Sequence, residues 1–253
     1  MTTTCPHENP EPPQARCSVA DLLRWSGMPA AGDDEDDPML DRHVFPVRWI
    51  EAAQPLMQEG SPLQSLYLVR SGTFKVFQTE QDGYEQVHAF AQQGDMLGLD
   101  GLHDERHGTG AVALEPSSVV VLVLRDWQRA MRETPALARL QARAASLELA
   151  RRRATLHNMA AVATEVRLAR FLLQLSARQA TREHPRSRIH LRMSRREIAS
   201  LLGVSHESVS RSLGLLSTEG LIRVRHREVD LVDEPGLIAR QSVTRPERHL
   251  AAS

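Results

Sequence analysis

Residues 195–231 constrain the fold more than any other part of the sequence. The stretches RREIASLLGV and HESVSRSLGLL carry apolar residues at helical spacing, and a brief turn at Gly203-Val204-Ser205 separates them. The following LIRVRHREVDLVD has the alternation of a two-stranded hairpin. Helix, turn, helix and hairpin in this order predict a winged helix-turn-helix domain.

The second of these helices carries a polar face that suits the major groove of DNA. Ser205 is a good N-cap, which places Glu207, Ser210 and Arg211 on one face within the first two turns. A carboxylate accepts a hydrogen bond from the amino group of cytosine, and a guanidinium donates two hydrogen bonds to guanine. A hydroxyl can donate or accept. We therefore expect these three residues to read bases. Supporting contacts are expected from Ser205, His206, Ser208, Arg195, Arg196, Arg223, Arg225 and Arg227.

The charge distribution agrees with a polyanion-binding C-terminal end. Residues 1–60 carry 11 Asp and Glu against 4 Arg, whereas residues 181–253 carry 13 Arg against 9 Asp and Glu. Lys75 is the only lysine, and a coding bias explains why Arg replaces Lys elsewhere. The number of arginines therefore says nothing about function, whereas their positions in the chain do. The alternative for residues 206–216 is a plain amphipathic helix with solvated charges.

Length and composition exclude several classes of protein. The chain has 253 residues, a mean hydropathy of −0.36 and no apolar run of 18 residues. We expect neither a membrane span nor a secretory signal, and therefore a cytoplasmic protein without a membrane partner. Cys5 and Cys17 are the only cysteines, which rules out a disulfide scaffold and a four-cysteine metal site within one chain.

Residues 44–126 have the pattern of an antiparallel β-roll of the jelly-roll kind. Short β-rich runs such as SLYLVRSGTFKVFQ and SSVVVLVLRD are divided by turn signals. Asp82-Gly83 indicates a hairpin, because glycine accepts a positive φ without steric cost, and Gly72 and Gly94-Asp95 indicate further turns. The fold class is therefore α+β, with an N-terminal β-roll, a long helix and a C-terminal winged helix-turn-helix.

The long helix is expected over residues 135–160, with Pro135 in its first turn, followed by a second helix over residues 164–179. A narrow stripe runs along the first of them at a spacing of three and four residues. It consists of Leu137, Leu140, Ala144, Leu147, Arg151 and Ala154. Such a stripe suits pairing with a second helix, so we expect it to be the dimerisation seam.

The N-terminal segment is polar and rich in proline, and we expect most of it to be flexible. Ser18 can cap a short helix over residues 18–26. The predicted divisions are a flexible extension and linker (1–38), a β-roll sensory domain (39–134), a dimerisation helix (135–163), a winged helix-turn-helix (164–235) and a tail (236–253).

These motifs together resemble the Crp/Fnr superfamily of transcription regulators. SLYLVRSGTFKVF, the GDMLGLDGL turn, the long helix and the helix-turn-helix occur in family order, from about residue 18 to residue 235. The run ESVSR resembles the E-x-x-S-R of the FNR branch, whereas the cAMP receptor branch carries R-E-x-x-x-R. The resemblance implies a homodimer on a palindrome with TTGAT-like half-sites, read by Glu207, Ser210 and Arg211. His206 departs from the pattern of both branches.

The resemblance also raises partners and effectors. The turn at residues 82–85 is similar to a family surface that touches RNA polymerase, which implies an activator. The family's cAMP pocket needs a Glu and an Arg-Ser pair, but Leu99, Thr109 and Gly110 stand in those places, so cAMP is not expected. The oxygen sensor of the FNR branch needs four cysteines, so an intramolecular [4Fe–4S] cluster is excluded.

Two other sensors stay open. One is a redox response of Cys5 and Cys17, against the alternative of two inert surface thiols. The other is haem, for which the available ligands are His43, His88, His103, His107 and His157. The His103–His107 stretch HDERH is expected to be a solvated loop and not a metal site. The rival functions are a jelly-roll metal enzyme and a sensor that acts through protein contacts.

Overall fold

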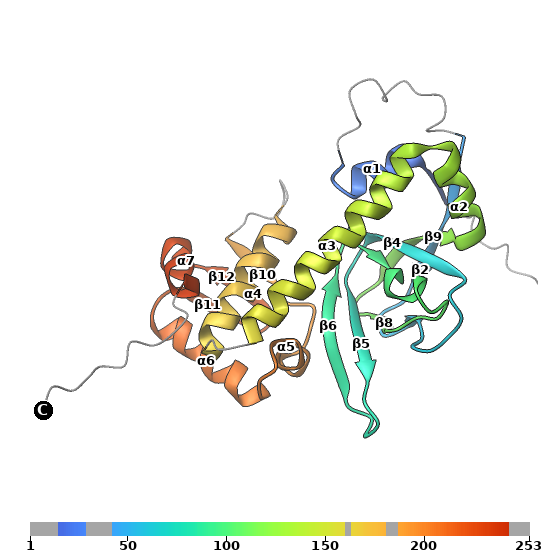
Figure 1. Cartoon of the computed structure of the whole chain (residues 1–253). Helices are drawn as coiled ribbons and strands as arrows, with labels where there is room; N and C mark the ends of the chain where they lie inside the picture. Colours follow the sequence, from blue (N-terminus) through green and yellow to red (C-terminus); the bar gives the residue numbers. More distant parts are fainter. Residues whose placement is uncertain (1–14, 29–41, 160–162, 181–186, 243–253) are drawn as a thin grey trace, which may run out of the picture.

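The structure is a computed structural model, and it describes residues 15–28, 42–159, 163–180 and 187–242. Figure 1 shows a β-roll and a C-terminal helical domain joined by the long helix α3 (Pro135–Met159), which runs past both. The predicted α+β architecture is confirmed: antiparallel roll, long helix, then winged helix-turn-helix.

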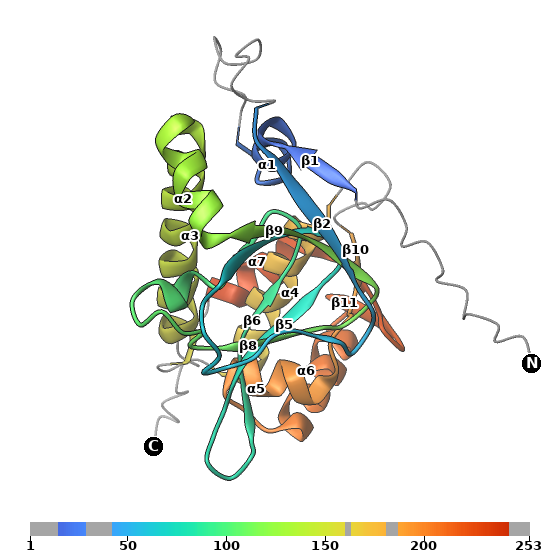
Figure 2. The ribbon, with the colours of Figure 1, turned by 90° about the vertical axis from the view of Figure 1, so that its right-hand side faces the viewer.

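Two antiparallel sheets build the roll, with strand orders β1-β2-β9-β4-β7 and β3-β8-β5-β6. The strands are β1 Arg16–Ser18, β2 Val44–Ile50, β3 Pro55–Met57, β4 Ser65–Ser71, β5 Phe74–Thr79, β6 Glu85–Ala91, β7 Met96–Leu97, β8 Gly110–Ala113 and β9 Ser117–Val123. A 3₁₀ helix, η1, spans Leu99–Leu102. In Figure 2 the strands wrap around a shared interior, which buries Val69, Phe74 and Val119 completely.

The turns of the roll fall where the sequence predicts them. Gly83 has a φ of 83° between β5 and β6, and the Asp82 carboxylate accepts a hydrogen bond from the Tyr84 amide at 2.9 Å. Gly72 has a φ of 87° between β4 and β5. A Cβ atom on Gly72 would lie 2.0 Å from the Ser117 hydroxyl, so both the backbone conformation and the space require glycine there.

The outer face of the five-stranded sheet is covered by α1 (Val19–Trp25), α2 (Leu124–Glu133) and the first half of α3. Trp127 of α2 is fully buried and meets Phe45 edge to face, with 5.8 Å between ring centroids. Its indole N–H donates to the Gln141 side chain at 2.6 Å. The first half of α3 is therefore fixed against the roll.

The C-terminal domain contains the remaining elements. These are α4 Thr164–Gln179, β10 Arg188–His190, α5 Arg195–Leu202, α6 His206–Thr218, β11 Ile222–Arg225, β12 Glu228–Leu231 and α7 Glu234–Ser242. The strands form an antiparallel sheet in the order β10-β12-β11. Leu168, Ile198 and Val209, at most 1% exposed, centre the core that α4, α5 and α6 share.

The expectation of a flexible segment is wrong for residues 16–18, whereas the short helix expected over residues 18–26 is confirmed by α1. Arg16–Ser18 form β1, which pairs with β2, and the predicted helix cap at Ser18 is confirmed by a capping box with Asp21. Val19 and Leu22 are fully buried in the cluster under α2 and α3. The three residues of β1 carry no strand pattern of their own, so the pairing with β2 was not evident from the local sequence.

The predicted dimerisation seam is covered by its own chain only in the first half of α3, whereas Leu147, Arg151 and Ala154 are exposed. Leu137 and Leu140 are at most 1% exposed in the core beneath the roll, and Ala144 packs against the same cluster. Leu147, Arg151 and Ala154 line a cavity between the roll and the C-terminal domain. A spacing of three and four residues shows which side chains share a face, but not which chain covers it.

Candidate DNA-binding surface

Helix α5 is defined by strong signals at both ends. Ser194 caps its start, accepting from the Glu197 amide at 3.2 Å, while the Glu197 carboxylate accepts from the Ser194 amide at 2.7 Å. Gly203 ends the helix in the left-handed conformation, at a φ of 63°. This glycine produces the tight turn that the helix-turn-helix prediction requires.

Helix α6 begins three residues after the end of α5 and is capped as predicted. The Ser205 hydroxyl accepts from the Ser208 amide at 3.2 Å. Val209, Leu213 and Leu216 are buried against the rest of the domain. The opposite face therefore points outward, and it carries the three predicted base readers.

The polar residues of this face lie side by side at the surface. Glu207 and Arg211 are exposed and Ser210 is half-buried. Arg195 of α5 donates to the Ser210 hydroxyl at 3.3 Å, so the two helices contribute to one surface. Arg211 donates to the Ser208 hydroxyl at 3.3 Å. These are single contacts in solvent, which base edges and phosphates can replace at low cost.

Glu207 is held as an acceptor. Its pKa is lowered, first by a hydrogen bond from its own amide and then by one from the Ser205 hydroxyl. The His206 ring lies 3.2 Å from the Glu207 carboxylate. The side chain therefore stays ionised at neutral pH, as hydrogen bonding to a cytosine amino group requires.

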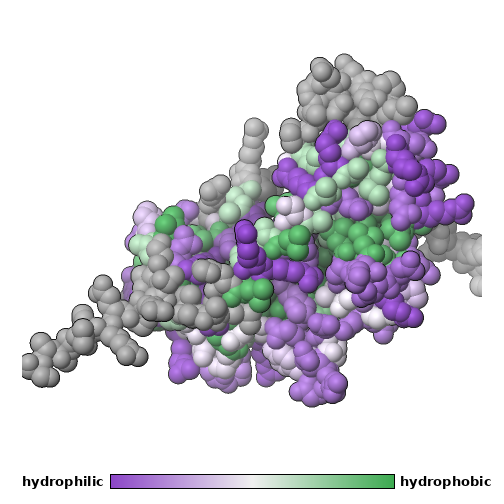
Figure 3. Space-filling view, in the orientation of Figure 1, coloured by the Kyte–Doolittle hydropathy of each residue, from purple (hydrophilic) through white to green (hydrophobic). Residues whose placement is uncertain are grey.

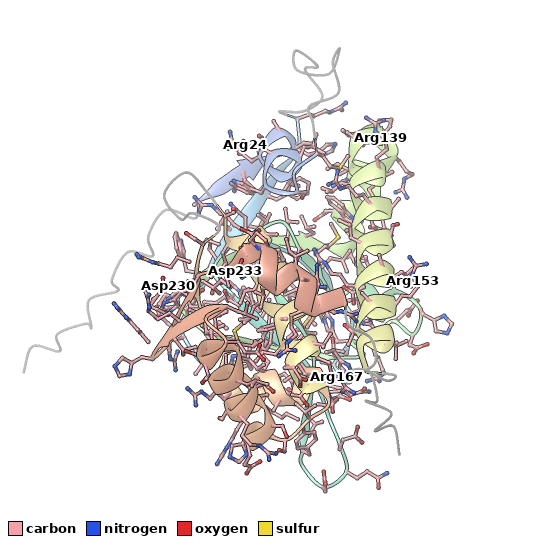
Figure 4. All side chains as sticks on the ribbon, turned by 90° about the vertical axis from the view of Figure 1, so that its left-hand side faces the viewer. Arg24, Arg139, Arg153, Arg167, Asp230 and Asp233 are labelled. Carbon is pink, nitrogen blue, oxygen red and sulfur yellow. The ribbon has the colours of Figure 1, made fainter. Side chains whose placement is uncertain are left out.

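The wing places further arginines beside this surface, together with acidic partners that the sequence prediction missed. Arg223 and Arg225 of β11 are exposed and lie opposite Asp230 and Glu228 of β12. Arg188 of β10 contacts Asp230 at 3.3 Å, and Figure 4 shows Asp230 on the wing. The antiparallel pairing itself was the available signal, since it brings residues of opposite charge into register.

Arg196 and Arg227 are likewise exposed. The Arg227 guanidinium donates to the Arg192 carbonyl at 3.3 Å, beside the wing tip where His226 has a φ of 54°. All the residues predicted to support DNA binding thus lie on α5, α6, the turn between them, or the wing.

The C-terminal domain is docked on the β5–β6 hairpin, a contact between distant segments that the sequence did not reveal. The Ser200 hydroxyl of α5 accepts from the Val87 amide at 2.8 Å and donates to the Glu85 carbonyl at 3.0 Å. Gln86 donates to the Ser200 carbonyl at 2.7 Å. Lys75 contacts both Glu85 and Glu197 of α5.

A cavity of about 520 Å³ lies where the roll, α3, α4 and α5 meet. Leu99 and Thr109 line it. They stand where the family's cAMP pocket has a Glu and the Arg of its Arg-Ser pair. The Thr109 hydroxyl donates to the Asp100 carboxylate at 2.9 Å. An anionic side chain thus occupies the region where a cyclic phosphate would need a cation. Figure 3 shows apolar surface on the roll alongside α3.

The described cysteine does not fit the role of a metal ligand or an exposed thiol. Cys17 is 3% exposed, and burial raises its pKa to about 11. Its thiol lies 3.6 Å from the Phe45 carbonyl. The expectation of a surface thiol is therefore wrong for Cys17, whereas Cys5 lies outside the described residues. Cluster ligation requires an accessible thiolate, which this site disfavours.

The histidines named as haem ligands are scattered. His88 lines the cavity, and burial lowers its pKa, as does the charge of Arg152, so its ring is neutral and able to ligate a metal. His43 contacts Glu133 at 3.3 Å, and the His103 side chain is 92% exposed. The loop predicted to be solvated is exposed at residues 103–106, whereas His107 is 4% exposed against Tyr67. The His157 side chain lies outside the described part.

Among the described residues, no three His, Cys, Asp or Glu side chains come together as metal ligands. The same part of the chain contains no helix that is long and apolar enough to cross a membrane.

Two family profiles match the sequence. A cyclic nucleotide-binding domain covers residues 47–134, and a Crp-like helix-turn-helix domain covers residues 166–240. These ranges coincide with the roll together with α2, and with the C-terminal domain.

Known regulators match over nearly the whole chain. The transcriptional regulatory protein btr of Bordetella pertussis is 37% identical over 87% of this chain and 90% of its own length. The transcriptional activator protein anr of Pseudomonas aeruginosa is 31% identical, covering 90% of this chain and 93% of its own. The solved structure of FixK2 from Bradyrhizobium japonicum is 26% identical with a TM-score of 0.68, covering 76% of this chain and 95% of that one.

Proposed function

The chain belongs to the Crp/Fnr family of transcription regulators, and from this premise we propose that it binds a palindromic DNA site as a homodimer. Each protomer contributes one α6 helix to one half-site. Members of this family are regulators and not enzymes, so the metal-enzyme alternative is set aside. The alternative of a sensor that acts only through protein contacts becomes an outcome of the test below.

The observation that carries the proposal is the exposed face of α6. Its cap, its buried opposite face and its neighbour Arg195 present Glu207, Ser210 and Arg211 outward together. Arg211 is suited to guanine, Glu207 to the amino group of cytosine, and Ser210 to either neighbour. A TTGAT half-site offers these groups on its two strands. His206, next to Glu207, adds a preference that the FNR branch pattern does not define.

The arginines around this face support a second role, the positioning of the helix on the duplex. Arg195, Arg196, Arg223 and Arg225 are exposed on α5 and the wing. Contacts from such residues to phosphates fix orientation without selecting sequence. The binding constant is therefore expected to fall steeply as salt is raised.

We place the dimer contact on the outer face of α3, opposite the face that the roll covers. Leu149 and Leu156 are 69% and 68% exposed there, although both are large and apolar. With them, Ala138, Ala142 and Ala145 follow a heptad spacing along α3. Three alanines permit close approach of two helices. Figure 4 shows Arg153 beside this stripe, on the outer side of α3.

The signal is proposed to be oxygen, redox state or a related metabolic cue. Relatives carry the names anaerobic regulatory protein, in Pasteurella multocida, and fumarate and nitrate reduction regulatory protein, in Salmonella typhimurium, both 29% identical. Buried Cys17 argues against a cysteine-ligated cluster, and Asp100 argues against cAMP. Haem remains a candidate only through His88, the one described histidine that lines the cavity.

RNA polymerase is proposed as a partner. The tip of the β5–β6 hairpin, residues 82–85, is exposed and projects beyond the body of the roll in Figure 1. A polymerase contact here would make the protein an activator. Its proposed location is the cytoplasm.

Selection from random duplexes tests the proposal without assuming a site. The intact protein is incubated with a 30-base-pair random library, and the bound fraction is amplified and sequenced. We expect a two-fold symmetric motif with TTGAT-like half-sites centred about 10 base pairs apart, the spacing that two winged domains related by a dimer axis require. No enriched motif would contradict the proposal and favour a sensor that acts through protein contacts.

A further inference from the structure

The sheet of the C-terminal domain carries two rows of charged residues across one face. Strands β10 and β11 lie on either side of β12. In the first row, Asp230 of β12 is in register with Arg188 of β10 and with Arg223 of β11. Because residues directly opposite each other project from the same face, the acid stands between two cations.

The second row lies two residues along and repeats this order. Glu228 of β12 is in register with His190 of β10 and with Arg225 of β11. Residues two apart on a strand share a face, so both rows lie on the same side of the sheet. The other side is apolar and buried in the core of the domain, with Ile189, Ile222, Val229 and Leu231.

Each carboxylate has a basic side chain on either side, and in both rows it contacts the one on β10. Arg188 lies 3.3 Å from the Asp230 carboxylate, and the His190 ring contacts the Glu228 carboxylate. The two arginines of β11 form no ion pair within the part of the chain that the structure describes. They are exposed on the edge strand, so their guanidinium groups keep their hydrogen-bond donors for another partner.

The other cations close to the wing tip are engaged elsewhere. Arg192, which follows β10, lies 2.9 Å from the carboxylate of Glu115. Arg227, in the turn between β11 and β12, donates to the Arg192 carbonyl at 3.3 Å. Neither of them takes up a carboxylate of β12. The contacts from β10 are therefore what keeps these carboxylates away from β11.

This choice of partner matters because a carboxylate of the same sheet competes with a phosphate for the same guanidinium. The carboxylate is tethered beside the arginine, so it competes at a high effective concentration. If Asp230 turned from Arg188 to Arg223, a phosphate would have to displace it before it could bind.

We propose that Arg188 and His190 are positioning residues for DNA binding. They hold the two β12 carboxylates on the β10 side of the sheet, which leaves Arg223 and Arg225 free to bind phosphates of the duplex. The assignment rests on the proposed function, because it concerns how the wing contacts DNA. It does not require that the DNA sequence be recognised, since phosphate contacts are the same on every sequence.

A cycle of substitutions in the first row separates this role from a change in net charge. Binding of the intact protein to a duplex of scrambled sequence is measured over a range of salt concentrations. Arg188→Met frees Asp230 to pair with Arg223, so one phosphate contact is lost. The slope of log K against log salt should become shallower by up to about 0.9, which is up to about eightfold weaker binding at 0.1 M salt than for the wild type.

The second substitution, Asp230→Asn, should restore the slope in the Arg188→Met variant. In the wild type the same change should have a smaller effect, because Arg188 already holds the carboxylate. We expect the effect on affinity to be about three- to eightfold larger in the Arg188→Met background. A simple change of net charge would instead act equally in both backgrounds, and that result would overturn the role of Arg188.

His190→Leu and Glu228→Gln form the same cycle in the second row, and the same coupling is expected there. Circular dichroism verifies the folding of each variant. Coupling in neither row would refute the proposal.

Arg129 and Asp126 on α2 provide the matched control, since they form an exposed pair at 3.2 Å on the roll. Arg129→Met and Asp126→Asn should show no coupling in DNA binding, and coupling equal to that of the two rows would refute the proposal. A wild-type protein that did not bind the scrambled duplex at low salt would also overturn it. The proposed function fails differently, by equal affinity for the palindrome and the scrambled duplex.

Discussion

The Ser200 hydroxyl of α5 and the Val87 amide of β6 form a 2.8 Å hydrogen bond between residues 113 positions apart. Ser200 is 6% exposed, so water does not replace this bond when it is lost. It joins the first helix of the DNA-binding motif directly to the edge of the sensory roll. We therefore expect a displacement of the β5–β6 hairpin to reach α5 through this contact as well as through α3.

Substitution of Ser200 by alanine should release this contact. The lost hydrogen bonds are expected to cost about 1–3 kcal/mol, because the Val87 amide is left without its partner in a buried position. Hydrogen exchange of that amide should then accelerate roughly 5- to 150-fold. Ser212→Ala, which removes a buried hydroxyl from α6, is the matched control and should leave Val87 unchanged. Unchanged exchange in Ser200→Ala would show that the docked arrangement is not populated in solution.

Arg211→Ala should lower affinity for the cognate palindrome by about 1–3 kcal/mol per half-site and relax the preference for guanine at one position. Arg223→Ala on the wing serves as the comparison, since loss of a phosphate contact weakens binding to all sequences alike. Both effects are measured by fluorescence anisotropy against a panel of single-base variants. An equal loss on every sequence for Arg211→Ala would refute its base-reading role.

Leu149→Glu should dissociate the proposed dimer, because two carboxylates would face each other where the proposed helix pair would bury leucine. The change should raise the dimer dissociation constant at least about tenfold, measured by analytical ultracentrifugation. Leu147→Glu makes the same substitution on the face that lines the cavity, and there the dimer should persist. A dimer weakened by Leu147→Glu but not by Leu149→Glu would restore the seam that the spacing predicted.

Cys17 should be unreactive in the folded protein. With a pKa of about 11, its thiolate fraction at pH 8 is about 0.1%, compared with about 10% for a thiol of pKa 9. In a Cys5→Ser background, alkylation by iodoacetamide at pH 8 should be at least about 100-fold slower in buffer than in 8 M urea. Raising the pH from 9 to 11 should lower the free energy of unfolding, because the unfolded thiol ionises first. Equal alkylation rates would mean that Cys17 is accessible.

The helix-turn-helix could be predicted because its signals are local. Ser194, Gly203 and Ser205 sit at helix ends, where caps and a left-handed turn require those residue types, and each is found in that role. The hairpin at Asp82-Gly83 was predictable for the same reason.

What the sequence did not reveal depends on long-range partners. Leu147 and Leu149 are both exposed, but only Leu147 lies on the side of α3 that faces the roll and the C-terminal domain, where it lines the cavity. Cys17 is buried because β1 pairs with β2, across a gap of 28 residues from Phe45. Asp95 contacts two arginines, one from α3 and one from α4. None of these contacts produces a periodic pattern of residues in the sequence.

Selection of a base sequence by α6 can be measured as a difference in affinity between two duplexes. Fluorescence anisotropy is measured for the intact protein on a TTGAT palindrome and on a scrambled duplex of equal composition, at 150 mM salt. We expect roughly 10³-fold tighter binding to the palindrome. Equal affinity for the two duplexes, with both falling together as salt is raised, would contradict it and leave only electrostatic attraction.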